Sequence, residues 1–317
     1  MVSIVIPVYN GSNYLKQAID SALVQTYPRV EVLVINDGST DDGLSEQIAL
    51  GYGQRIRYFS KPNGGVASAL NIGLQQMHGE WFAWLSHDDV FTPNRLANDM
   101  QVVRNHPEAR VIFCRVETIN AAGRVTGKIM YPIEQVTNPR QALILGGINM
   151  CAMTIHRDCF KAVGLFNEKN STIQDTEMSL RLAAAFSFFL DPQVGLYSRD
   201  HSGRGTYLLS EQHRQDLRKL CQVIHDELKI GAFFPDLSEH PEKGPAAWTW
   251  MGSQYLSFGG RDYAAESFRN ALAACKTFPQ QIVTGLRITA LWMAKTLLSK
   301  QIRFKLKTYL QFITRGT

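Results

Sequence analysis

The sequence predicts an α/β protein with a mostly parallel sheet that carries helices on both faces, followed by an α-helical C-terminal region. Two observations indicate this class. Short apolar runs alternate with helical patterns through the first part of the chain, an order typical of parallel strands joined by crossover helices. Beyond Thr206 only helical patterns remain. We therefore predict two domains, 1–205 and 206–317.

Four short apolar runs are the expected strands of the first domain. They lie at 2–7, 31–35, 55–59 and 81–85. A helix should begin behind Asn10-Gly11-Ser12, because apolar residues recur at helical spacing over 15–23. Asn63-Gly64-Gly65 should open another helix over 66–77.

Polar residues follow three of these strands. Pro7, Tyr9 and Asn10 end the first strand, Asp37 follows the second, and Ser86-His87-Asp88-Asp89 follows the fourth. Ligands of parallel sheets bind beyond the carboxyl ends of the strands, where the strand order reverses. Adjacent carboxylates repel each other unless a cation neutralises them, and Mg²⁺ or Mn²⁺ is the usual cation beside phosphates. The alternative is an Asp pair that caps a helix or closes a turn.

Four motifs in this order resemble the family 2 glycosyltransferases. They are Ile4-Val5-Ile6-Pro7-Val8-Tyr9-Asn10, the segment 34–41, the segment 63–73, and Leu85-Ser86-His87-Asp88-Asp89 with Pro93. The likeness covers residues 1–205. It implies a GT-A fold (a Rossmann-like sheet), a nucleotide-sugar donor, a divalent metal ion, Mg²⁺ or Mn²⁺, and inversion at the anomeric carbon.

The resemblance implies that the loops after the first two strands bind the nucleotide. Asp37 can accept the imide N–H of a uracil or thymine base, and Tyr9 can lie along the base or ribose. The alternatives are a turn aspartate before Gly38 and an aromatic residue of the core. Pro7 and Asn10 belong to the same loops.

The later motifs complete the expected nucleotide site. Asn63 and Gly65 offer backbone N–H groups at a helix start, suitable for an anion. The resemblance places Asn71 near the same pocket, and His87 belongs to the loop beside it. Arg204 could supply a diphosphate cation, because Leu70 stands where the family often has arginine.

Asp88 is the expected main metal ligand, since Ser86 stands where the family often has aspartate. The segment 197–205 resembles a Tyr-Arg-x-His stretch of the family, whose basic residues can close over the diphosphate. His201 would then reach the metal ion. The alternative is an ordinary solvated loop histidine.

Inverting transfer needs a base that removes the acceptor proton. The segment 174–182 resembles the family's acidic pair followed by a helix, with Gln174 in place of the first acid. Asp175 is then the catalytic base. The alternatives are Asp175 as a helix N-cap and Glu168 as the base.

The C-terminal region has one tetratricopeptide-like helix pair over 248–279 and a basic tail. Nine of the 33 basic residues lie beyond Glu266, where no acid occurs, so the remaining 24 face 28 acids. Such asymmetry indicates a lipid surface or nucleic acid. The neighbouring apolar stretch 282–298 favours an anionic membrane surface, and no nucleic-acid partner is expected. The alternative is a solvated basic face.

Localisation is expected to be cytoplasmic and peripheral at the inner face of the cell membrane. No signal peptide and no uncharged run of 18 apolar residues is seen. Five cysteines without a paired motif indicate a reducing compartment.

These features predict a metal-dependent inverting glycosyltransferase. It would move a sugar from a UDP- or dTDP-sugar to a hydroxyl of a growing glycan, a cell-surface polysaccharide or glycolipid. One alternative is a catalytically weak nucleotide-binding scaffold in glycan assembly. The other is a sugar-nucleotide nucleotidyltransferase, although 8–12 lacks that class's basic Gly-rich loop.

Overall fold

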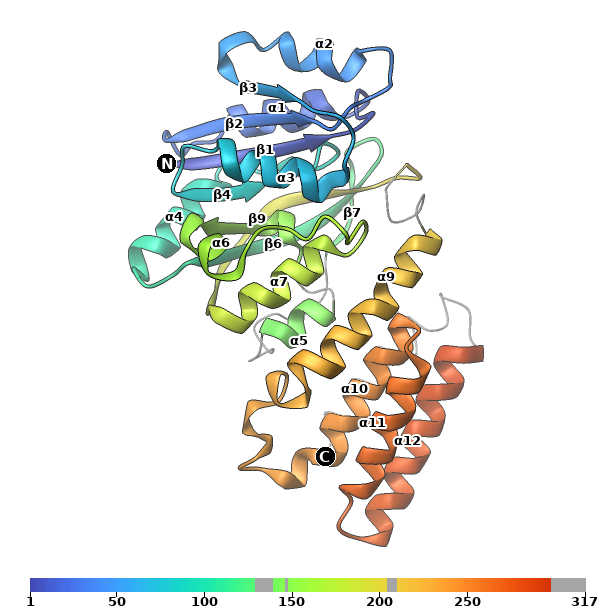
Figure 1. Cartoon of the computed structure of the whole chain (residues 1–317). Helices are drawn as coiled ribbons and strands as arrows, with labels where there is room; N and C mark the ends of the chain where they lie inside the picture. Colours follow the sequence, from blue (N-terminus) through green and yellow to red (C-terminus); the bar gives the residue numbers. More distant parts are fainter. Residues whose placement is uncertain (129–138, 146–147, 204–209, 298–317) are drawn as a thin grey trace. The chain divides into compact units, whose positions relative to one another are not determined.

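The computed structural model describes residues 1–128, 139–145, 148–203 and 210–297 (Figure 1). Contacts divide the chain into two compact units, Met1–His213 and Arg214–Thr317. The predicted boundary between 205 and 206 falls on 204–209, outside the described residues.

The first unit is built on one mixed sheet. Within the described residues its strands follow the order β3-β2-β1-β4-β8-β6-β9-β5, and β7 pairs with β6. The strands are β1 (Val2–Val8), β2 (Val30–Asn36), β3 (Arg57–Ser60), β4 (Trp81–Trp84), β5 (Val90–Phe91), β6 (Val111–Asn120), β7 (Val125–Lys128), β8 (Met153–His156) and β9 (Phe188–Asp200).

The first four strands are parallel neighbours, as the sequence predicts. β1 pairs in parallel with both β2 and β4, and β2 pairs in parallel with β3. Beyond β4 the sheet turns antiparallel, because β8 runs against both β4 and β6. The α/β class is confirmed, and the antiparallel strands are a feature that the alternating pattern did not indicate. Strand order reverses at β1, so the predicted crevice lies at its carboxyl end.

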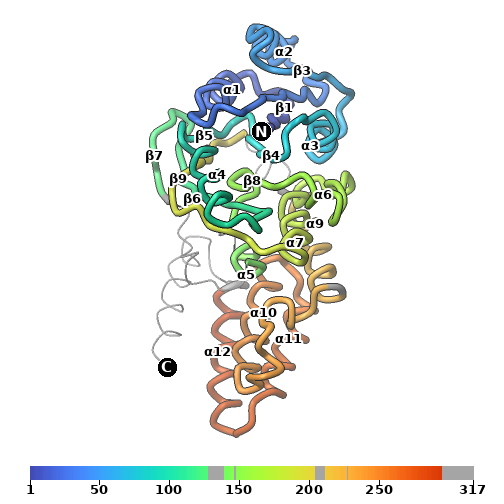
Figure 2. The backbone as a smooth tube through the Cα atoms, turned by 90° about the vertical axis from the view of Figure 1, so that its left-hand side faces the viewer, coloured from blue at the N-terminus to red at the C-terminus, as the bar shows by residue number. Residues whose placement is uncertain are grey.

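Helices cover both faces of this sheet. The helices of the first unit are α1 (Leu15–Leu23), α2 (Leu44–Leu50), α3 (Gly65–Gln76), α4 (Arg95–Asn105), α5 (Pro139–Ile144), α6 (Arg157–Val163) and α7 (Gln174–Ala185), and α9 (Ser210–Val223) leads into the second unit. α1 and α3 lie on opposite faces of β1 (Figures 1 and 2). A Cβ at Gly73 would lie 2.4 Å from Val5 Cγ1, so only glycine lets α3 pack this closely on β1.

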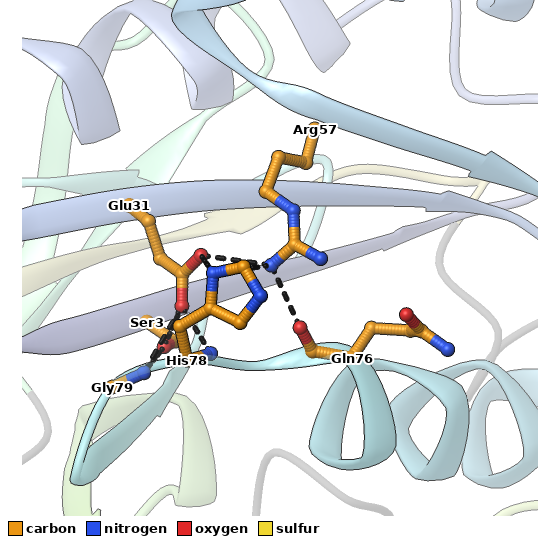
Figure 3. A network of polar contacts seen from close by, with 6 residues as sticks. All are labelled: Ser3, Glu31, Arg57, Gln76, His78 and Gly79. Carbon is orange, nitrogen blue, oxygen red and sulfur yellow. Dashed lines mark hydrogen bonds and ion pairs between the residues drawn. The ribbon is translucent and has the colours of Figure 1, made fainter.

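A polar network closes the sheet edge at which β1 and β2 begin (Figure 3). Glu31 Oε2 accepts a hydrogen bond from Arg57 at 2.9 Å. Its Oε1 accepts from the backbone N–H of His78 at 2.6 Å, from that of Gly79 at 3.1 Å and from Ser3 Oγ at 2.5 Å. Burial favours the neutral carboxyl, but these donors outweigh it and lower the pKa of Glu31. The carboxylate thus ties β1, β2 and β3 to the turn before β4.

The second unit is helical. The helices α10 (Gly244–Phe258), α11 (Arg261–Ala273) and α12 (Phe278–Leu297) run side by side (Figures 1 and 2). A Cβ at Gly252 would lie 2.4 Å from Phe268 Cε1, so α10 and α11 approach each other through a glycine. None of the described helices is long and apolar enough to cross a bilayer.

All five cysteines are free and buried. Burial raises the pKa of Cys114, Cys159 and Cys221 to about 12. A thiol that stays protonated is a poor nucleophile and forms disulfides slowly.

Candidate active site

The loop after β1 is fastened to the loop after β2. Asn10 adopts φ 50°, a left-handed conformation that asparagine tolerates. Its Oδ1 accepts from the Thr40 N–H at 2.7 Å, and its own N–H donates to Ser39 Oγ at 3.0 Å. Asn10 therefore does not cap α1. The N-cap residue is Tyr14, which makes no side-chain capping bond.

Two further residues of this loop have different exposures. Pro7 is buried in β1 in register with Ile35, and the strand continues to Val8 instead of stopping at the proline. Tyr9 is 47% exposed, so it does not belong to the core and its ring is accessible to a planar ligand.

The His87 ring packs against Gly11, in the loop between β1 and α1. A Cβ at Gly11 would approach His87 Cδ2 to 2.4 Å, so a glycine is needed beneath this ring. Burial lowers the pKa of His87, and the Asp88 charge only partly offsets this.

Asp37 is almost fully buried beside the end of β1, where its N–H donates to Val8 O at 2.8 Å. Its Oδ1 accepts from Lys61 Nζ and, at 3.0 Å, from the Gly64 N–H. Its Oδ2 accepts from the Gly65 N–H at 2.8 Å. The N–H groups expected to bind an anion at the start of α3 thus meet the Asp37 carboxylate.

The remaining predicted residues of this region are placed as follows. Gly65 has φ +85°, and Asn63 is exposed. The Asn71 amide is buried and bonded on both sides: Oδ1 accepts from the Phe166 N–H at 3.0 Å, and Nδ2 donates to Glu168 Oε1 at 2.8 Å. Asn71 therefore holds the loop that carries Glu168. Its direct contact with nucleotide stays a prediction.

The predicted metal ligands lie side by side. His201 Nε2 is 3.0 Å from Asp88 Oδ2. Burial alone would raise the pKa of Asp88, but His87, His201 and Ser86 outweigh it and lower that pKa. The Gly203 N–H donates to His201 Nδ1 at 3.2 Å. The Asp88 carboxylate therefore favours its charged form although the residue is almost fully buried.

A buried arginine, Arg199, holds the backbone of Asp88 in place. Arg199 is 1% exposed, and its Nε donates to the Asp88 carbonyl at 2.8 Å. Its Nη2 donates to Gln17 Oε1 at 2.6 Å, its backbone N–H to Asp89 Oδ1 at 2.8 Å, and its guanidinium carbon lies 4.4 Å from the Tyr14 ring centre. In this conformation the donors of Arg199 are used inside the protein.

Asp175 lies in the first turn of α7 and is not its N-cap. The helix begins at Gln174 with Ile173 as the N-cap residue, and Asp175 Oδ1 accepts from the Thr176 N–H at 2.7 Å. Burial raises the pKa of Asp175, and the nearby His213 opposes that effect. A carboxylate with a raised pKa is suited to take a proton near neutral pH.

Cys151 is a buried thiol between the two halves of the predicted site. It lies in the short 3-10 helix η3 (Met150–Ala152), which packs against both β4 and α7. Burial raises the pKa of Cys151 well above its ordinary value, and the charges of Asp89, Asp175 and Asp88 raise it further. The segments that carry Asp88 and Asp175 therefore pack near the same short helix, and a shared site stays a prediction.

The donor set at Asp88 and His201 fits a divalent cation. Among the described residues no group of three or more His, Cys, Asp or Glu side chains is arranged to hold a metal. Mg²⁺ and Mn²⁺ often take only one or two protein ligands and complete their shells with water and phosphate oxygens. Carboxylate oxygens suit both Mg²⁺ and Mn²⁺.

Other residues either fall outside the structure or were not predicted. Arg204 lies outside the described residues, and Leu70, which stands where the family often has arginine, is fully buried. Lys61 and Cys151 were missed. A lysine at the end of β3 is a usable signal, since β3 is parallel to β2, but nothing in the sequence marks Cys151.

The reversed strand order at β1 and the polar loops at the carboxyl edge of the sheet place the chain in the class of proteins with a GT-A fold. A family model described as glycosyl transferase family 2 matches residues 3–164, and the chain belongs to this family. The family resemblance seen in the sequence is thereby confirmed.

The similar proteins support the same assignment. An uncharacterized glycosyltransferase of Rickettsia conorii is 39% identical over 300 residues, 92% of this chain and 47% of that protein. The chain spans between 32 and 47% of the length of three such Rickettsia relatives.

Two solved structures confirm the GT-A fold. S. aureus TarS 1-349 in complex with UDP-GlcNAc has a TM-score of 0.61 and 15% identity, over 97% of this chain and 91% of that one. The mannosyltransferase PcManGT from Pyrobaculum calidifontis, in complex with GDP-Man and Mn²⁺, has a TM-score of 0.58 and 18% identity, over 96 and 82%. At these identities the likeness concerns the fold alone.

Proposed function

We propose that this glycosyltransferase moves a sugar from a UDP- or dTDP-sugar to a hydroxyl of a growing glycan or glycolipid, with inversion. The observation that carries the proposal is the pair formed by Asp88 and His201 behind β4, with Asp175 as the proposed base. Support for a nucleotide-sugar donor comes from the solved structures, which hold UDP-GlcNAc and GDP-Man.

The proposed reaction is a direct displacement. Asp175 takes the proton of the acceptor hydroxyl, and the acceptor oxygen attacks the anomeric carbon opposite the leaving group. The bond from that carbon to the diphosphate breaks, and the nucleoside diphosphate leaves with the bonding electrons. Mn²⁺ or Mg²⁺ held by Asp88 and His201 would neutralise the charge that develops on the diphosphate.

The donor side of the site would be built by three groups. Asp37 receives the base, the accessible ring of Tyr9 lies along it, and the Asn10 loop frames the ribose. His87 and Asn63 would line the same site. These roles rest on the predicted motifs and on the positions given above.

Donor turnover tests the proposal against a nucleotide-binding scaffold. We expect the wild type to release UDP or dTDP from a panel of nucleotide sugars in a reaction that EDTA abolishes and Mn²⁺ restores. Asp88→Asn keeps the volume of the side chain but loses its charge, so metal-stimulated turnover should be lost while the fold remains. Binding of donor without any turnover would favour the scaffold instead.

We further propose that the second unit docks at an anionic membrane surface, which would place the enzyme at the inner face of the cell membrane. α12 exposes a row of apolar side chains over four turns: Phe278, Ile282, Val283, Leu286 and Met293. No acid lies on this helix or beyond it, and Lys276, Arg269 and Arg287 are exposed. Apolar surface bordered by cations is typical of helices that lie in a lipid interface.

A further inference from the structure

Lys61 stands directly against the carboxylate that is expected to receive the donor base. Its Nζ donates to Asp37 Oδ1 and, at 2.7 Å, to the Pro62 carbonyl. The side chain of Lys61 is 17% exposed and that of Asp37 is 4% exposed. A ligand that reaches Asp37 therefore meets Lys61 as well.

The number of free acceptor positions on Asp37 can be counted. A carboxylate offers about four lone-pair positions, two on each oxygen. Lys61 Nζ and the Gly64 N–H use both positions of Oδ1, and the Gly65 N–H uses one position of Oδ2. One position on Oδ2 remains for a ligand.

Nucleobases differ in what they present to such a site. Uracil and thymine present a single imide N–H between two carbonyl oxygens. Guanine presents two adjacent N–H donors, which match a carboxylate only if both of its oxygens can accept. Cytosine presents an amino donor beside a ring nitrogen acceptor, and this acceptor would face an Asp37 lone pair without a proton between them.

We infer that Lys61 is a specificity-determining residue that restricts the donor to uridine or thymidine nucleotides, and this inference rests on the proposed function. By occupying Oδ1, Lys61 leaves room for one imide N–H and none for the second donor of guanine. Its ammonium group also offers a donor to a uracil carbonyl oxygen beside the imide. An unpaired polar group in a covered site weakens binding by roughly ten- to a hundredfold.

The test is isothermal titration of the full chain with UDP, dTDP, GDP and CDP in the presence of Mn²⁺. For the wild type we expect similar affinity for UDP and dTDP, and affinity for GDP and CDP lower by about tenfold or more. Lys61→Met frees one position on Oδ1, so the ratio of GDP to UDP affinity should rise by about tenfold. Lys61→Arg retains a cationic donor and should keep the ratio near that of the wild type.

Lys161→Met is the matched control, since Lys161 is an exposed α6 lysine that also pairs with an aspartate, Asp158. It should leave all four affinities unchanged. Thermal unfolding of each variant shows whether the fold is retained. If Lys61→Met does not fold, Lys61→Ala, which also removes the donor, should raise the GDP to UDP ratio.

The outcomes separate this inference from the proposed function. Equal wild-type affinity for UDP and GDP, or a folded Lys61→Met variant with an unchanged ratio, overturns the role of Lys61 and leaves the transferase proposal standing. Failure of the wild type to bind any of the four nucleotides overturns both. A wild-type preference for UDP that Lys61→Met relaxes and Lys61→Arg restores supports the inference.

Discussion

Asp175 is half-buried in the first turn of α7, and its proposed role as the base decides its expected behaviour. Asp175→Asn keeps the shape of the side chain, and Asp175 is not the N-cap of α7, so the free energy of unfolding should change little. Losing the general base should lower kcat by ~10²–10⁴. Donor affinity, measured by titration calorimetry, should stay the same.

The pH profile gives an independent readout of the same residue. Burial raises the pKa of Asp175, and only the deprotonated form can take a proton from the acceptor. Wild-type kcat should therefore rise with pH over a range above that of an ordinary carboxyl, and this limb should vanish in Asp175→Asn. Glu168→Gln is the matched control and should keep the limb. A dead Glu168→Gln beside an active Asp175→Asn would transfer the base role to Glu168.

Glu31 is the residue whose ionisation matters most for the opposite edge of the sheet. Because the folded state lowers its pKa, it contributes stability above its ordinary pKa and loses that stability as the pH falls through the lowered value. Glu31→Gln should lower the free energy of unfolding by about 1–3 kcal/mol at pH 7. The difference from wild type should shrink below about pH 4.

Urea unfolding at several pH values measures this effect. The matched control is Glu46→Gln, a half-exposed first-turn residue of α2 whose contact is one 3.2 Å bond from Tyr58. A Glu31→Gln deficit that stays constant from pH 7 to pH 3 would contradict the ionic explanation.

At the scale of elements, the approach of α10 to α11 depends on one glycine. A methyl group at Gly252 would lie 2.4 Å from the Phe268 ring, which is itself buried. Gly252→Ala should therefore lower the free energy of unfolding by about 1–3 kcal/mol through overpacking. UDP affinity should not change, because every donor residue named above belongs to Met1–His213.

Gly231→Ala supplies the control, since a Cβ at Gly231 would meet no heavy atom within 4 Å. Its effect on stability should stay within about 0.5 kcal/mol. Equal losses in the two variants would mean that the glycine contact between α10 and α11 carries no particular strain.

The sequence predicts best those elements that have a clear apolar periodicity along the chain. The parallel strands and α3 could be predicted because their apolar periodicity reflects which face is buried. Helix starts were harder. Asn10 and Asp175 look like caps, but Asn10 bonds to Thr40 thirty residues away and Asp175 lies inside the first turn. The antiparallel strands β8 and β6 were missed because pairing across the sheet leaves no local pattern.

The candidate site was predictable to the extent that topology determines it. The carboxyl ends of parallel strands meet at one edge, so Asp37 and Asp88 could be placed together from sequence alone. Contacts that depend on side-chain direction could not be placed. Lys61 against Asp37 and Arg199 beneath Asp88 are such contacts, and both came only from the structure.

At the scale of the whole molecule, charge and apolar surface are distributed unevenly. The exposed apolar row of α12 and the nine basic residues beyond Glu266 belong to the same end of the sequence. We expect the chain to sediment with anionic vesicles and much less with neutral ones, since each surface cation contributes about 1 kcal/mol. Raising the salt concentration to 1 M should release it, because screening then acts within ~3 Å.

A double variant tests the apolar part of this surface. Ile282→Ser with Leu286→Ser should weaken vesicle binding about tenfold or more. Leu44→Ser with Leu50→Ser removes two leucines of similar exposure from α2 and should have no effect. Equal binding to neutral and anionic vesicles would refute the electrostatic part of the proposal. If light scattering finds a wild-type dimer that the double variant no longer forms, the apolar row serves self-association instead.

The five buried thiols can report local unfolding, because each becomes reactive only when its surroundings open. Cys114, Cys151 and Cys159 belong to Met1–His213, whereas Cys221 and Cys275 belong to Arg214–Thr317. An alkylating reagent can reach each sulfur only after the surrounding segment has opened. Pulsed alkylation followed by peptide mass spectrometry should therefore show, cysteine by cysteine, which unit opens first as denaturant is added. Added nucleotide should slow the labelling of Cys151 more than the labelling of Cys221.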